Sequence, residues 1–252
     1  MEIFFDLKKL KNLKKPIIVT IGNFDALHLG HAKLLNKIVQ KSKSGTSIVI
    51  SFRNHTSTIL KKEQTPEIIN LDEKVKIFKK FNINCLVFLE FTKFLAKKNF
   101  KDFLKDLKEE ISFDEIVFGK GATFGKNRDG DEKNVQDFGS KNDFKATYIE
   151  KLIIDNISSA SDIRSKIFAK SFLKAKTFLG RSYSIYVTDN LLKFDSKKFC
   201  IPPSGKYFVT ILKDEKSLKI EIEILDEENF KILKFLKNIS IKQPYYITFN
   251  EK

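Results

Sequence analysis

Two of the chain's three histidines, His28 and His31, fall within one short segment, Gly22–His31. An apolar run, Ile17–Ile21, precedes this histidine segment, and a run with helical spacing of apolar residues, 34–39, follows it. A strand, a glycine turn and a helix start would present unpaired N–H groups and the positive end of a helix dipole, which together stabilise an anion. Imidazoles add donors for phosphate oxygens. The histidine segment therefore predicts phosphate chemistry.

A metal site is the alternative for the same histidines, since pairs of imidazoles also bind zinc. Zinc needs a third protein ligand, which His55 or a carboxylate would have to supply. Cys85 and Cys200 lie far apart in the chain without ligand-like spacing. We expect both to be ordinary buried thiols, and we expect no metal ion held by the protein itself. A reducing, cytoplasmic setting fits this use of cysteine.

The bulk composition of the chain limits its class. The 252 residues are enough for one large domain or two smaller ones, and 42% hydrophobic residues is typical of globular proteins. No apolar run approaches the roughly 18 residues of a membrane span, and the charged N-terminus is too broken for a secretion signal. The net charge of +15 is spread over lysines that alternate with acids, as in 101–110. We expect a field that attracts anionic substrates such as nucleotides, and no nucleic-acid binding.

The first two thirds of the sequence alternate strand-like and helix-like runs. Such alternation predicts an α/β fold with a Rossmann-like parallel sheet, in which ligands bind at the carboxyl ends of strands. Asn70 and Glu73 are spaced like a helix-capping box at the start of one helix. The expected strands cover 17–24, 47–52, 84–90, 115–119 and 145–154, and the expected helices cover 31–43, 71–81, 100–110, 161–170 and 172–179.

After Gly180-Arg181 the pattern changes to apolar and polar residues at period two. Turn residues such as Pro202-Pro203-Ser204-Gly205 separate these runs. We expect a small antiparallel β-barrel domain over 181–252, following the α/β domain over 1–180. Its expected strands cover 183–187, 206–212, 217–225 and 245–249.

The histidine segment resembles the signature of the HIGH-type nucleotidyltransferase superfamily. Its sequence most resembles that of the FMN adenylyltransferase module of bacterial bifunctional riboflavin kinase/FAD synthetases. Four further segments resemble that family in the same order, namely Ser51–His55, the glycine loop Gly119–Asp131, Ile157–Arg164 and Leu179–Tyr183.

The resemblance implies an enzyme that transfers the adenylyl group of ATP to FMN, giving FAD and pyrophosphate, with Mg²⁺ on the ATP phosphates. It implies catalytic roles for His28, His31 and Arg164, ATP contacts by Gly22, Asn23, Phe24, Ser159 and Ser161, and FMN contacts by Phe52, His55 and Phe124. Taken singly, several of these residues also have structural interpretations. The serines could cap a helix, Arg164 could form an ion pair, the two phenylalanines could be core, and His55 could cap a turn.

The second module departs from the family. Riboflavin kinases of this kind carry a Gly-Phe-Pro-Thr-Ala-Asn segment that holds Mg-ATP, whereas residues 183–200 contain neither glycine nor proline. Glu221 or Glu223 falls in the region of the family's catalytic glutamate. We therefore predict a shortened, degenerate kinase module without riboflavin kinase activity.

Three other functions stay open on the sequence. A related nucleotidyltransferase could use another acceptor, such as pantetheine phosphate, nicotinamide mononucleotide, or glycerol or choline phosphate. A flavin- or nucleotide-binding protein without turnover is the second alternative, and RNA binding driven by the positive charge is the third and weakest. The sequence indicates no oligomeric state.

Overall fold

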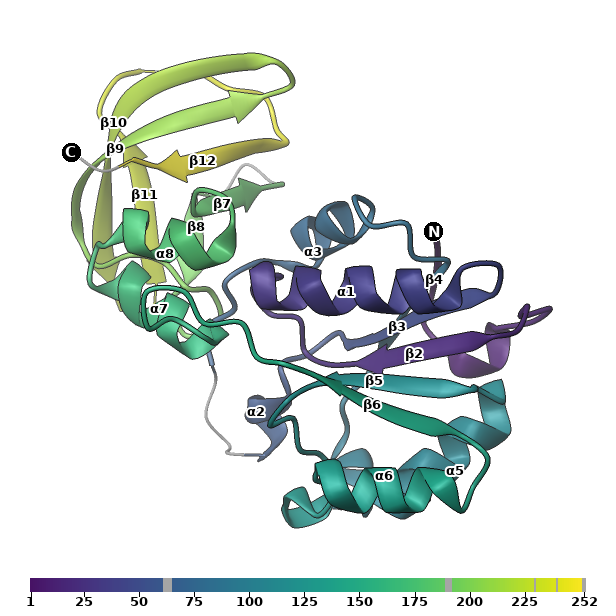
Figure 1. Ribbon diagram of the computed structural model, residues 1–252. Coiled ribbons are helices and arrows are strands. Elements are labelled where there is room, and N and C mark those ends of the chain that lie inside the picture. Colours follow the sequence, from purple (N-terminus) through teal and green to yellow (C-terminus); the bar gives the residue numbers. More distant parts are fainter. Residues whose placement is uncertain (61–64, 189–191, 229, 239, 251–252) are drawn as a thin grey trace. The chain divides into compact units, whose positions relative to one another are not determined.

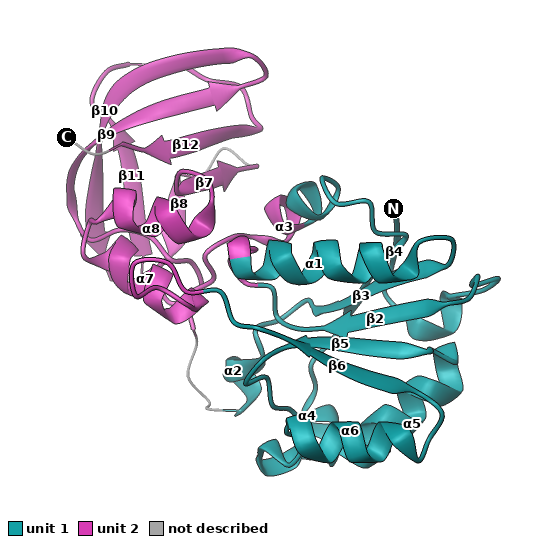
Figure 2. Cartoon of the chain, in the orientation of Figure 1, with its two compact units in different colours: residues 1–24, 30–63, 75–152 teal, residues 25–29, 64–74, 153–252 magenta. Residues whose placement is uncertain are grey.

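The computed structural model describes residues 1–60, 65–188, 192–228, 230–238 and 240–250. Packing groups the chain into two compact units (Figure 2). The first unit comprises Met1–Phe24, Gly30–Glu63 and Val75–Leu152, and the second comprises Asp25–Leu29, Gln64–Lys74 and Ile153–Lys252. Each unit is made of three separate stretches of the chain. The division of the sequence into domains over 1–180 and 181–252 stays a prediction.

The first unit is built on a six-stranded sheet in which every neighbouring pair is parallel (Figure 1). This confirms the expected Rossmann-like sheet. Its strands are β1 (Glu2–Phe4), β2 (Ile17–Ile21), β3 (Thr46–Phe52), β4 (Cys85–Leu89), β5 (Glu115–Gly119) and β6 (Lys145–Ile149).

The strand order of this sheet, β1-β4-β3-β2-β5-β6, contains a switch point between β2 and β5. After β2 the chain adds β3 and β4 on one side, and it then crosses to build β5 and β6 on the other. Open parallel sheets bind ligands in the crevice at the carboxyl ends of such strands. Gly22 follows β2 and Lys120 follows β5, so the histidine segment and the glycine loop both start at this edge.

Helices cover both faces of the sheet, with α1 (Leu29–Ser42) on one and α5 (Phe100–Ile111) on the other (Figure 1). The buried residues of α5 recur at helical spacing, which gives the helix a single apolar face. That face joins a core cluster that includes Val19 and Ile50. The remaining α-helices of this part of the chain are α2 (Thr56–Leu60), α3 (Leu71–Phe78), α4 (Lys93–Lys97) and α6 (Glu132–Ser140).

The second unit contains α7 (Ala160–Phe168), α8 (Phe172–Leu179) and a six-stranded antiparallel sheet that curls into a partial barrel (Figure 1). Burial alternates along its strands, as the period-two pattern predicts. The expected antiparallel β part is therefore confirmed. Its order is β7 (Ser184–Val187), β12 (Tyr245–Phe249), β9 (Gly205–Lys213), β10 (Lys216–Glu227), β11 (Phe230–Phe235) and β8 (Lys193–Asp195).

Some elements differ from the sequence-based expectation. The strand expected over 17–24 ends at Ile21, because the chain leaves the sheet there and turns at Phe24, whose φ is 48°. The helix expected from His31 begins two residues earlier, at Leu29. The sequence patterns did not indicate the strands β1, β8 and β11 or the helices α2, α4 and α6.

No helix among the described residues is both long and apolar enough to cross a lipid bilayer.

Asn70 caps α3, as its spacing from Glu73 predicts. Its side-chain oxygen accepts a hydrogen bond from the Glu73 amide at 2.8 Å, and its side-chain nitrogen donates to the Tyr186 carbonyl at 3.1 Å. We expect Asn70→Ala to lower the free energy of unfolding by about 1–2 kcal/mol, because one substitution removes both bonds. Denaturant unfolding would measure the change. Asn36→Ala, at an exposed position of α1, is the control and should leave stability equal or slightly higher; equal effects in both variants would contradict the capping role.

Candidate functional site

The turn after β2 is fixed by hydrogen bonds within the first unit. The Gly22 amide donates to the Ile50 carbonyl at 3.1 Å, and the Asn23 side chain donates to Thr56 Oγ1 at 2.8 Å. The Ser51 hydroxyl donates to the Asn23 carbonyl at 3.2 Å. The turn is therefore held against the end of β3 and the start of α2.

Phe24 and His31 form an aromatic contact behind this turn. The Phe24 side chain is 2% exposed. The centre of its ring lies 5.1 Å from that of the His31 ring and 5.5 Å from that of the Phe78 ring, both pairs in edge-to-face geometry. A Cβ on Gly22 would lie 3.3 Å from the Phe24 ring, so the turn has little room for a side chain. Phe24 thus orients His31 in the first turn of α1, and contact between Phe24 and ATP stays a prediction.

The next five residues, Asp25–Leu29, pack in the second unit. Arg164 forms an ion pair with Asp25 and donates from Nε to the Pro66 carbonyl at 2.6 Å. The Ile68 amide donates to the other oxygen of Asp25 at 3.1 Å. The two paired side chains are 12% and 5% exposed, so this is a buried ion pair. Arg164 therefore forms an ion pair in this fold, and Asp25 is its partner.

The Arg181 side chain binds backbone carbonyls of the same segment, Asp25–Leu29. Its guanidinium donates to the carbonyls of Ala26 at 2.8 Å and Leu27 at 3.2 Å. Leu27 has a φ of 42°, in the left-handed region that costs free energy for a branched side chain. The bonds from Arg181 stabilise this unfavourable backbone.

His28 is buried, at 6% exposure, with its ring 4.6 Å from that of Phe178 in α8. Burial, reinforced by the positive charge of Arg181, lowers the pKa of His28 to about 4. The imidazole is therefore neutral at pH 7, with one nitrogen that donates and one that accepts.

The depressed pKa of His28 predicts a pH-dependent loss of stability. In the unfolded chain the pKa is near 6.5, so below that pH the unfolded state binds a proton that the folded state does not. Stability is therefore retained above about pH 6.5 and lost as the pH falls towards 4. Between pH 7.5 and pH 5 the loss through His28 should be about 2 kcal/mol. Denaturant unfolding of the wild type and His28→Gln would measure it, and the same slope in both would contradict the assignment.

The serine motif forms the cap of α7. The Ser159 hydroxyl accepts from the Asp162 amide at 3.3 Å and donates to the Asp162 carboxylate at 3.0 Å. The Ser158 amide also donates to that carboxylate, at 2.9 Å, and these bonds outweigh burial in keeping the pKa of Asp162 below its usual value. Ser161 is exposed in the first turn of α7. Ser159 therefore has a structural role here, and ATP contacts by either serine stay predictions.

The candidate FMN residues belong to two places in the first unit. Phe52 ends β3 and meets the Phe91 ring at 5.2 Å, and His55 Nδ1 lies 2.6 Å from the Ser57 hydroxyl. Phe124, in the glycine loop after β5, stacks on Phe118 at 5.2 Å. All three side chains have a packing or turn partner, so their contact with FMN stays a prediction.

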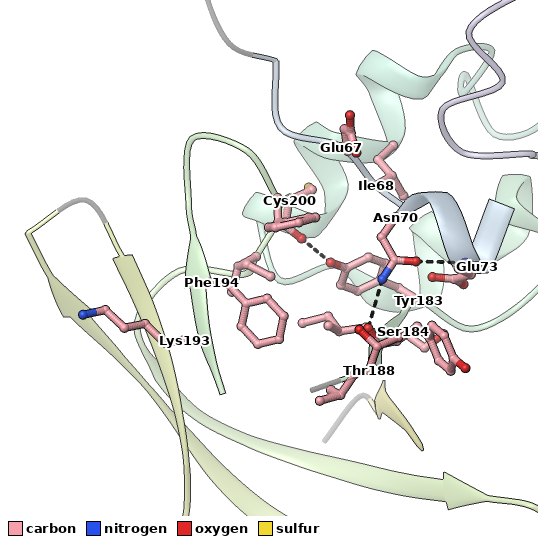
Figure 3. Close-up of a pocket in the computed structure, with 15 residues that line it drawn as sticks. Glu67, Ile68, Asn70, Glu73, Tyr183, Ser184, Thr188, Lys193, Phe194 and Cys200 are labelled. Carbon is pink, nitrogen blue, oxygen red and sulfur yellow. Dashed lines mark hydrogen bonds between the residues drawn. The ribbon is translucent and has the colours of Figure 1, made fainter. Parts of the chain in front are cut away.

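The second unit also contains a small cavity of about 120 Å³ that the sequence did not indicate (Figure 3). Several of its polar groups bond to one another. Tyr183 donates from its hydroxyl to the Cys200 carbonyl, and Asn70 bonds both Tyr186 and the Glu73 amide. Because these groups are satisfied within the protein, we assign no ligand to this cavity.

The sequence motifs did not single out Asp25 and Arg181, which hold the histidine segment in place through the contacts described above. Asp25 lies inside the histidine segment, and Arg181 lies inside the Leu179–Tyr183 junction. Both were therefore within matched motifs, but their partners are distant in sequence.

Comparison with known proteins gives a family match and several relatives. A family model described as FAD synthetase matches residues 10–162. A bifunctional riboflavin kinase/FMN adenylyltransferase of Buchnera aphidicola subsp. Acyrthosiphon pisum is 32% identical over 193 residues, which are 73% of this chain and 61% of that protein. An FAD synthetase of Listeria monocytogenes is 27% identical over 202 residues, covering 77% of this chain and 80% of that protein.

This chain spans 61% of the length of that Buchnera aphidicola relative, and also 61% of the corresponding protein of a second Buchnera aphidicola subspecies, Schizaphis graminum. Among solved structures, a macrolide-efflux protein from Streptococcus pneumoniae has a TM-score of 0.75 at 18% identity. That likeness covers 98% of this chain and 96% of the other. This likeness shows that the two proteins share a fold.

Proposed function

The chain belongs to the FAD synthetase family, and from this we propose that it transfers the adenylyl group of ATP to FMN. A phosphate oxygen of FMN attacks the α-phosphorus of ATP, the bond from that phosphorus to the bridging oxygen breaks, and pyrophosphate leaves. The observation that carries the proposal is the histidine segment, which lies within the family match and follows β2 at the switch point of the parallel sheet.

The proposed chemistry requires little from the protein beyond positioning and charge stabilisation. His31 lies in the first turn of α1, where an imidazole donor and the helix dipole both favour a phosphate. Gly22 keeps the turn free of a side chain, so that the nucleotide can approach the backbone. We propose that Asn23, Phe24, Ser159 and Ser161 complete the contacts with ATP.

His28 would act as a neutral donor, since its pKa lies well below 7. Charge that develops on the phosphate oxygens would then be met by a fixed dipole, without proton transfer.

Arg164 would contact the β- and γ-phosphates without giving up its partners. A guanidinium has five N–H donors, and the bonds to Asp25 and Pro66 come from Nη2 and Nε. The donors on Nη1 are compatible with a phosphate ligand.

Mg²⁺ would arrive with ATP and be held by phosphate oxygens. Among the described residues, no three His, Cys, Asp or Glu side chains cluster as a metal site. Magnesium retains water and binds substrate phosphates readily, so a protein cage is not required. For the flavin, the aromatic side chains Phe52 and Phe124, with His55, would supply the walls that an isoalloxazine ring prefers.

We further propose that riboflavin kinase activity is absent. The support is the sequence of residues 183–200, which has no glycine or proline where the family has its Mg-ATP segment. A glutamate base at Glu221 or Glu223 without that phosphate-binding segment would have no positioned ATP to act on.

The test is chromatography of the products after mixing the protein with Mg-ATP and either FMN or riboflavin. The expected result is FAD and pyrophosphate from FMN, and no FMN from riboflavin. Absence of pyrophosphate release with FMN would overturn the transferase proposal, and FMN made from riboflavin would overturn the loss of kinase activity. A panel of other phosphate acceptors distinguishes a related transferase, and FMN binding without turnover identifies a binding protein.

A further inference from the structure

We propose that Arg181 is a positioning residue for His28, a role that rests on the adenylyl transfer proposed above. Phe178, Gly180 and Arg181, at the end of α8, each contact part of the segment that carries His28. We call these three residues the α8 grip.

Arg181 fixes the backbone on the N-terminal side of His28. The Leu27 carbonyl that it binds belongs to the same planar peptide group as the His28 amide. Holding that carbonyl therefore fixes the peptide plane that contains the His28 nitrogen and Cα, the atom from which its side chain leaves the backbone. The second bond, to the Ala26 carbonyl, fixes the peptide before it.

The rest of the α8 grip acts on the two residues that follow Leu27. Phe178 lies against the imidazole of His28, at 4.6 Å between ring centres. Gly180 has a φ of 72°, and a Cβ there would lie 2.4 Å from the Leu29 side chain, so this close approach needs glycine. Three nearly consecutive residues thus hold Leu27, His28 and Leu29.

The charge of Arg181 also acts on His28. The positive charge of Arg181 contributes, after burial, to the low pKa of His28. Glu73, from α3, acts on Arg181 itself, and Asp25 is paired with Arg164. Removal of the Arg181 charge should therefore raise the pKa of His28, while burial continues to keep it below its usual value.

An arginine suits this position better than a lysine. The planar fork of the guanidinium reaches two successive carbonyls, whereas a lysine ammonium is a single point on a flexible stem. Arg181→Lys keeps the positive charge and loses the fork, and Arg181→Met loses both.

The first measurement is steady-state FAD formation by the full chain. We expect kcat to fall about 10-fold in Arg181→Lys and further in Arg181→Met, because misplacement of a reacting contact lowers the rate even when binding is retained. The KM for FMN should change less than about twofold, since Arg181 lies outside the proposed flavin contacts. Lys174→Met, at an exposed position of α8, is the matched control and should retain wild-type rates. Thermal melts establish that each variant is folded.

The second measurement does not depend on activity. The chain has only three histidines, so NMR titration of the imidazoles can be assigned with single His→Gln variants. We expect the His28 signal to titrate near the wild-type value in Arg181→Lys and at clearly higher pH in Arg181→Met.

The two measurements separate failure of this inference from failure of the proposed function. If the wild type makes no FAD but the His28 titration moves as expected, the transferase proposal fails and the contact between Arg181 and His28 stands. If the wild type is active and folded Arg181→Met keeps both its rate and its His28 titration, the positioning role is overturned.

Discussion

His31→Ala is expected to lower the rate of FAD formation about 100-fold or more, while the protein stays folded. Loss of one donor that stabilises developing phosphate charge typically costs a factor of about 10²–10³, or roughly 3 kcal/mol of transition-state stabilisation. His31 lies in the first turn of α1 and is oriented by the buried ring of Phe24. A donor in that position acts together with the N-terminal dipole of the helix. Coupled detection of pyrophosphate would give kcat and KM.

Two variants of α1 sharpen this test. His31→Gln keeps a side-chain donor and should lose less activity than His31→Ala. Asn36→Ala lies on the exposed face of the same helix and should be as active as the wild type. A near-normal rate in His31→Ala would refute the phosphate role of this histidine.

Asp25→Ala is expected to have the largest effect on stability, a loss of about 3–5 kcal/mol in the free energy of unfolding. The substitution leaves the guanidinium of Arg164 buried without its carboxylate, and removal of one partner of a buried pair is strongly destabilising. It also removes the acceptor of the Ile68 amide. Equilibrium unfolding in denaturant, followed by circular dichroism, would measure the change.

The matched control is an ion pair at the surface. Lys120 and Glu150 form such a pair at 2.8 Å, with both side chains more than half exposed. Solvent screening makes surface pairs weak, so Glu150→Ala should leave the unfolding midpoint unchanged. Asp25→Asn, which keeps hydrogen-bonding capacity, should be less destabilised than Asp25→Ala. Equal midpoints for Asp25→Ala and the wild type would show that the pair contributes no net stability.

The fold was predictable where the sequence pattern is strong over a long run. Parallel strands buried on both faces form nearly continuous apolar runs, as in Ile17–Ile21, where Thr20 is the one polar residue, and α5 shows its apolar face clearly. The short β1 was not predictable, because its three residues form a strand only through pairing with β4. In α6, Gly139 and Asn134 are weak helix formers, and the Asp131 cap, which accepts from the Asn134 amide at 2.8 Å, helps to start the helix.

The candidate site was predictable only as far as its local segments. Spacing along the chain indicated that the histidines follow a strand and start a helix, because neighbours in sequence share those elements. The partner of Arg164 was not predictable in this way, since Asp25 lies 139 positions away. The same limit applies to Arg181, whose acceptors Ala26 and Leu27 lie more than 150 positions earlier. Tertiary packing alone brings these groups together.

The interleaved membership of the two units has a consequence for how this protein could be divided. Asp25–Leu29 and Gln64–Lys74 interrupt the chain of the first unit and pack in the second. A single break anywhere between Leu29 and Ile153 would therefore separate at least one of these short stretches from the rest of the second unit. Experiments that divide the chain, such as complementation of split fragments or circular permutation, would have to keep both stretches with the second unit.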